Sequence, residues 1–173
     1  MTPKIYSPSV EDQIAYLQVA LELQVLDVPD IVQWADDQIS ADECPAYELI
    51  QLALMGGSNQ YDIASQLLRV GTPSLSRAEV LPYVLAKAHG KLLLDRDFGK
   101  VLAQGLFLSW VHSNYDFPDQ LRLCGYFEDA YSLAENGVAG TVDQINQELL
   151  EFTAQFQGHI RLESKLSESP AHS

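Results

Sequence analysis

Carboxylates gather in one short stretch of the sequence. Asp36, Asp37, Asp42 and Glu43 place four acids within eight residues, and Trp34 lies just before them. Oxygen ligands at this density suit a divalent cation, but the stretch lacks the regular ligand spacing and the turn glycine of an EF-hand loop. We therefore predict no metal site here. The acids form either a solvated surface or a contact surface for a basic protein.

A second stretch has the residue types of an acid–base site. His112 is followed four residues later by Asp116, and an imidazole oriented by a carboxylate can move protons near neutral pH. The spacing favours a structural role, because His112 falls at the expected end of one helix and Asp116 at the expected start of the next. His89 is interpreted as a surface histidine. We predict no catalytic residue.

The familiar catalytic and cofactor-binding motifs are absent from the sequence. It contains no nucleophile elbow, zinc-protease helix, Walker loop or dinucleotide-binding glycine turn. Cys44 and Cys124 lack the C-x-x-C spacing of zinc and redox sites, so both are predicted to fill gaps in the core. We expect no cofactor. An enzyme whose carboxylate or histidine site forms only in the folded chain stays an alternative.

Apolar residues recur at helical spacing along nearly the whole chain, without the sustained alternation of a half-buried strand. The pattern predicts an all-α fold, a compact bundle of about eight helices with mostly antiparallel neighbours. The predicted helices begin near Ser9, Asp27, Cys44, Asn59, Ser76, Asp97, Asp116 and Thr141. The helix from Cys44 to Met55 is apolar on nearly all sides, so it is predicted to be central and buried.

Length and hydropathy predict one domain. At 173 residues the chain can bury a core without disulfides or metals. We predict a single helical domain over residues 1–157 and a polar, disordered tail over residues 158–173. Residues 1–8 lack the apolar run of a signal peptide or anchor, and no later stretch approaches the about 18 apolar residues of a membrane span. We expect a cytoplasmic protein without a membrane partner.

The charge balance limits the kinds of partner. The chain carries 24 acidic and 10 basic residues, for a net charge of −14. Such a surface repels nucleic acids and anionic membranes and attracts basic proteins. We therefore expect no nucleic-acid partner, although solubility alone also explains an acidic surface. Tyr6, Tyr61 and Tyr115 fall near expected helix boundaries, where an exposed ring can anchor a partner.

A helical signature occupies the first third of the chain. It reads Ile-Val-Gln-Trp-Ala-Asp from Ile31 to Asp36 and continues with Ile39, Pro45, Leu49-Ile50 and Leu52-Ala53-Leu54. This pattern resembles the opening half of an uncharacterised, immunity-like family of small all-helical bacterial proteins. The resemblance implies no catalytic residue. It makes a basic toxin the natural partner of the acids, because complementary charge speeds association.

The expected function is that of a non-enzymatic, acidic protein-binding module of bacterial type. Its expected contact face consists of Trp34, Asp36, Asp37, Asp42 and Glu43. Besides the enzyme with a site assembled in the fold, a structural homodimer is the other alternative. A homodimer would expose an apolar patch too large for a monomer.

Overall fold

The computed structural model describes residues 8–159, and every regular element in that part of the chain is a helix. The all-α prediction of about eight helices is confirmed. The α-helices are α1 (Val10–Glu22), α2 (Val28–Ala41), α3 (Tyr47–Ala53), α4 (Gln60–Val70), α5 (Arg77–Leu94), α6 (Phe98–His112), α7 (Phe127–Glu135) and α8 (Val142–Ala154). Two 3₁₀ helices, η1 (Asp119–Gly125) and η2 (Gln157–His159), complete this part of the chain. No helix within residues 8–159 is long and apolar enough to cross a membrane.

Most of these helices begin at a capping side chain, at the position where the sequence predicts a helix start. Ser9, Asp27, Ser76 and Thr141 each accept a hydrogen bond from the backbone amide three residues later. The side chain of that third residue accepts one from the amide of the cap, which completes a capping box at all four helices. Asn59 caps α4 by accepting from two backbone amides. The short polar residues thus fix where the chain turns into helix.

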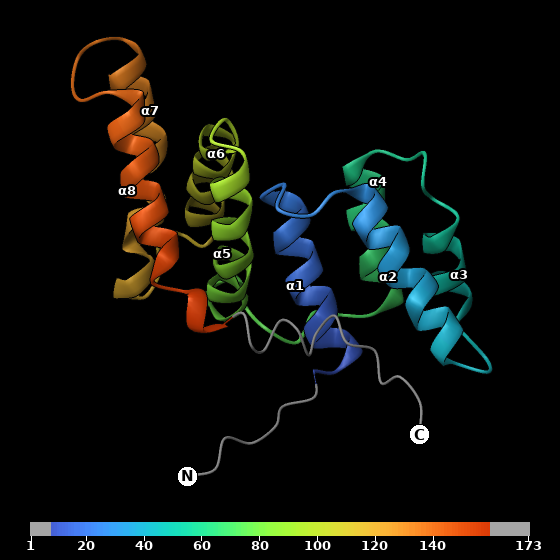
Figure 1. The fold of residues 1–173 in the computed structure, drawn as a ribbon. Helices are drawn as coiled ribbons and strands as arrows, with labels where there is room; N and C mark the ends of the chain where they lie inside the picture. Colours follow the sequence, from blue (N-terminus) through green and yellow to red (C-terminus); the bar gives the residue numbers. More distant parts are fainter. Residues whose placement is uncertain (1–7, 160–173) are drawn as a thin grey trace.

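The helices lie in successive layers (Figure 1). Helices α7 and α8 form one end, α5 and α6 come next, α1 follows, and α2, α3 and α4 form the other end. Helix α1 therefore sits in the middle, with α5 on one side and α4 on the other. Helix α3 packs against α2 and α4 at the end of the molecule.

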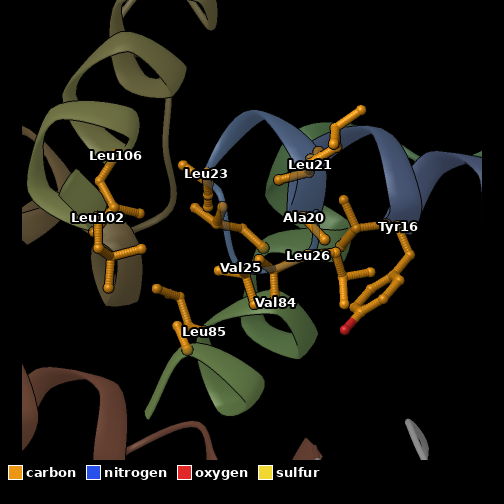
Figure 2. Close-up of a cluster of buried hydrophobic side chains, with 14 of the residues drawn as sticks. Tyr16, Ala20, Leu21, Leu23, Val25, Leu26, Val84, Leu85, Leu102 and Leu106 are labelled. Atoms are coloured by element: carbon orange, nitrogen blue, oxygen red, sulfur yellow. The ribbon is translucent and has the colours of Figure 1, made fainter. Parts of the chain in front are cut away.

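The centre of the core lies where α1, α5 and α6 meet. Figure 2 shows Leu23 close to the leucines of α5 and α6, and Leu23, Leu85, Leu102 and Leu106 are fully buried. Gly105 permits this approach, because a β-carbon there would stand 2.7 Å from Leu23 Cδ2.

The chain leaves α1 through a tight turn that uses a non-glycine residue. Gln24 adopts the left-handed conformation, with φ of 56°. The amide of Gln24 donates to Leu21 O and that of Val25 to Ala20 O, which is the hydrogen-bond pattern of a Schellman motif. Helices α6 and α7 end in the same way, with Asn114 and Gly137 at the left-handed position.

The prediction that residues 44–55 form a central, buried helix is wrong. Helix α3 has only seven residues and lies at the end of the molecule, where α2 and α4 cover one side of it. Leu49 and Leu52 face those neighbours and are buried, whereas Tyr47 and Leu54 are 68% and 76% exposed. The all-round apolar pattern therefore marks a helix with one side open to solvent.

The predicted helix from Asp116 is divided. Its first part is the 3₁₀ helix η1, which has no side-chain cap, and α7 begins only at Phe127. The prediction that Asp116 caps a helix is therefore wrong. Gly125 marks the division, because a β-carbon there would stand 2.4 Å from the Trp110 ring of α6. The backbone passes directly against this ring, and Leu121 and Cys124 before it and Phe127 after it are buried.

Candidate protein-binding surface

The acidic stretch occupies the corner between α2 and α3. Asp42 ends α2 with an extended backbone, and its Oδ1 accepts a hydrogen bond from the Cys44 amide at 2.9 Å. This local bond turns the chain toward α3, as short acidic side chains commonly do at turns. Because α2 and α3 pack together, the acids at the end of α2 and in the loop lie beside the start of α3.

The four acids Asp36, Asp37, Asp42 and Glu43, which we call the acidic corner, are all exposed. Asp37 Oδ1 accepts a hydrogen bond from Gln33 Nε2 at 3.0 Å. Asp36 and Asp37 project about 100° apart around the axis of α2, so these two carboxylates do not converge. Within residues 8–159, no group of three or more His, Cys, Asp or Glu side chains could hold a metal ion. The acidic corner is therefore a spread negative surface.

Trp34 differs from the four exposed acids because its side chain packs against the core. The indole is partly buried, packs against the core, and donates from Nε1 to Gln13 Oε1 of α1 at 2.8 Å. The side-chain amide of Gln13 in turn donates from Nε2 to Pro8 O at 3.3 Å. Trp34 thus joins α2 to α1 and holds the acidic corner in place. Its role as a contact residue stays a prediction.

An apolar stripe on α3, which was not predicted from the sequence, borders the acidic corner. Tyr47 and Ile50 of α3 and its C-cap residue Leu54, which we call the α3 stripe, recur at spacings of three and four residues. They therefore share one side of the helix, opposite the buried Leu49 and Leu52. The sequence did contain a signal for this stripe, because the apolar residues of this short helix fall on two separate faces.

The two cysteines differ in their surroundings. Cys124 is buried, as predicted, and burial raises the pKa of its thiol to about 12. The same prediction for Cys44 is wrong, because that residue is exposed in the loop of the acidic corner. The loop continues at Pro45 and places Cys44 before α3 begins, so no neighbouring helix covers it.

His112 contacts a different carboxylate from the one next in sequence. Its Nδ1 lies 3.5 Å from Glu22 Oε1 of α1, and Arg77 of α5 pairs with the other oxygen of the same carboxylate. Arg77 Nη1 also donates to the fully buried Ser109 at 3.3 Å. These contacts link α1, α5 and α6 where the three helices meet. They fit a structural role for His112, at the last position of α6.

The prediction that His89 is a surface residue is wrong. Its side chain is buried, and its Nδ1 lies 2.9 Å from the Oγ1 of Thr153, which is fully buried. Thr153 Oγ1 also donates to Leu150 O at 3.1 Å. The pair joins α5 to α8 and leaves neither polar group unsatisfied.

Three tyrosines and a polar tail were also singled out from the sequence. Tyr61 and Tyr115 are exposed, as expected for rings near helix boundaries, with 76% and 59% of their surface accessible. The Tyr115 ring also packs edge-on against Trp110 at 4.7 Å. Tyr6 lies outside the described residues. So does the predicted tail, apart from Gly158 and His159, which belong to η2.

Comparison with known proteins assigns no class to this fold or surface. No family model, curated protein or solved structure matches the chain.

Proposed function

We propose that this chain is a non-enzymatic protein-binding module whose acidic corner and α3 stripe bind a basic protein. The α3 stripe is the observation that carries the proposal. Tyr47 and Leu54 are 68% and 76% exposed, although large apolar side chains cost free energy when they face water. A partner that covers them would recover that free energy.

The acids beside the stripe indicate the charge of the partner. Glu43 lies four residues before Tyr47, and Asp42 turns the chain into the same helix. An apolar centre with a charged rim is the usual composition of a protein interface. Carboxylates at the rim speed the approach of a basic partner and select against acidic ones. The immunity-like role expected from the sequence, with a toxin as partner, stays a prediction.

The proposal can be tested by capturing partners with matched charge variants. One variant replaces all four residues of the acidic corner by Lys. The control variant makes the same four charge reversals far from α3, at exposed acids of η1, α7 and α8 and the loop before η1. These control positions are Asp116, Asp119, Asp129 and Glu151. Wild-type protein and both variants are immobilised, and proteins retained from cell extract at low and high salt are identified by mass spectrometry.

We expect the wild-type and control proteins to retain a basic protein at low salt, and the acidic-corner variant to lose it. Retention should fall at high salt, because salt screens exposed charges. The purified partner should then bind Leu54→Glu more weakly than wild type, since the change places a charge within the α3 stripe. If both charge variants retain the same proteins as wild type, the proposal is wrong.

A further inference from the structure

Helix α6 carries a second apolar surface, on the side away from the core. Val101, Gln104, Leu108 and Val111, which we call the α6 stripe, recur at spacings of three, four and three residues. Residues at these spacings form one continuous row along a helix. Leu102 and Leu106 lie on the opposite side and are fully buried.

The α6 stripe is open to solvent from Val101 to Leu108, and Val111 at its end is partly buried. Val101 and Leu108 are 36% and 43% exposed, and Gln104 is exposed between them. Helix α7 packs against the other side of α6, where Tyr131 lies against Gly99, and Leu23 at the end of α1 packs against Gly105 along the edge of the stripe. Helix α6 is therefore apolar on both sides, with one side used by the fold.

We propose that the α6 stripe is the contact surface for a second copy of this chain, paired antiparallel about a two-fold axis near Gln104. Alternating spacings of three and four residues are the pattern by which two helices pack side by side. A two-fold contact requires a surface that is complementary to itself. In this arrangement Val101 of each copy meets Leu108 of the other.

The distribution of charge favours a second copy over a charged partner. The whole chain has a net charge of −14, so two copies repel each other wherever acidic surfaces meet. From Phe98 to Val111 there is no Asp or Glu, and the one charged residue, Lys100, pairs with Glu135 of its own chain at 2.7 Å. This is a stretch of helix where a second copy meets little repulsion.

Gln104 gives the contact its polar centre. A side-chain amide has both donors and an acceptor, so two Gln104 side chains can pair with each other across the axis. A carboxylate or an ammonium group at this position would repel its own copy. One polar residue within an apolar row also fixes the register of paired helices.

The expected association is weak. One helix side is small compared with the about 800 Å² per partner of a typical stable interface. We therefore expect a dissociation constant of roughly 10–100 µM. Sedimentation equilibrium across about a hundredfold range of concentration around these values would measure it.

Two matched variants separate this proposal from the proposed function. Leu108→Glu places two like charges in the pair and should raise the dissociation constant by about tenfold or more. Leu54→Glu makes the same change at an exposed leucine of the α3 stripe, at the far end of the molecule, and should leave self-association unchanged. Binding of a basic partner should be weakened by Leu54→Glu and left unchanged by Leu108→Glu. Either proposal can therefore fail without the other.

A cross-link tests the antiparallel arrangement. In a Cys44→Ser background, Gln104→Cys should form a disulfide-linked dimer under mild oxidation, because the two residues meet near the axis. Lys87→Cys, at an exposed position of α5, serves as the control and should stay largely monomeric. The proposal is overturned if the wild-type chain is monomeric at all concentrations, if Leu108→Glu associates as wild type does, or if both cysteines cross-link equally.

Discussion

Gly105 of α6 lies against the backbone of Leu23, which follows α1. A β-carbon at position 105 would stand 3.2 Å from Leu23 Cα as well as 2.7 Å from its side chain. Because Leu23 is fully buried in the centre of the core (Figure 2), neither its backbone nor its side chain has free space to move into. The distance between α1 and α6 is thus set by the absence of a side chain on α6.

Gly105→Ala should destabilise the protein. Overpacking a filled core costs about 1–3 kcal/mol, which outweighs the about 1 kcal/mol that alanine contributes through helix propensity. Chemical denaturation of the variant should give a lower free energy of unfolding.

Gly90→Ala is the matched control for this substitution. Gly90 is an exposed residue within α5, and a β-carbon there would meet nothing within 4 Å. Only helix propensity then acts, so this variant should be more stable than wild type by about 0.5–1 kcal/mol. Equal effects of the two substitutions would contradict the packing at Gly105.

Gln24→Gly should stabilise the turn after α1. Gln24 holds a φ of 56°, a conformation that glycine adopts without the steric cost of a β-carbon. The gain should be about 0.5–1 kcal/mol, because the greater freedom of glycine in the unfolded chain offsets part of it. Lys91 Nζ donates to the backbone oxygen of Gln24 at 2.7 Å, and this bond is kept. Gln24→Ala, which retains the β-carbon, should show no such gain in thermal unfolding.

Glu79 should make stability depend on pH in the acid range. The Ser76 amide donates to Glu79 Oε2 at 2.7 Å and, with the Ser76 hydroxyl, lowers the pKa of this carboxyl from its ordinary value of 4.5. A lowered pKa in the folded state means that the contribution is fully present above pH 4.5 and is lost as pH falls through the lowered value. Glu79→Gln keeps a side-chain acceptor but does not titrate. The stability difference between wild type and this variant should therefore shrink on acidification, and a constant difference would argue against the prediction.

The two thiols should react at very different rates. The thiolate is the nucleophile, and Cys124 combines burial with a pKa of about 12, whereas Cys44 is exposed. A thiol reagent at mildly alkaline pH should modify only Cys44 in the folded chain and both residues in denaturant. Cys44→Ser should then show no rapid reaction, and rapid labelling of that variant would mean that Cys124 is accessible.

The sequence predicted the helix starts well, because a cap depends on residues within one turn of each other. Ser76 with Glu79 and Thr141 with Gln144 carry this information locally, and the structure contains both capping boxes. The division of the helix after Asp116 was beyond such reasoning. It depends on the contact between Gly125 and Trp110, which come from different elements.

Burial was harder to predict than helix formation. His89 follows Leu85 by four residues and precedes Leu92 by three, so helical spacing alone would have placed it on the buried side of α5. Its partner Thr153 is 64 residues away and could not be identified from spacing. The exposure of α3 was missed because an apolar pattern does not say how many neighbours a helix has. The acidic corner was identified from composition, whereas the bordering α3 stripe depends on where α3 sits.

The layered arrangement of the helices determines which part of the molecule can unfold locally. Helices α2, α3 and α4 lie between α1 and α5 in the sequence, within residues 27–76 (Figure 1). Because α1 packs against α5, these three helices form a long loop whose two ends are held together. This loop is held to the rest of the fold chiefly through α1, including the bond between Trp34 and Gln13. Transient opening of the loop can therefore spare the pairing of α5 with α8. Such partial openings are the cooperative units that amide hydrogen exchange resolves, and here the more readily opened unit contains both the acidic corner and the α3 stripe.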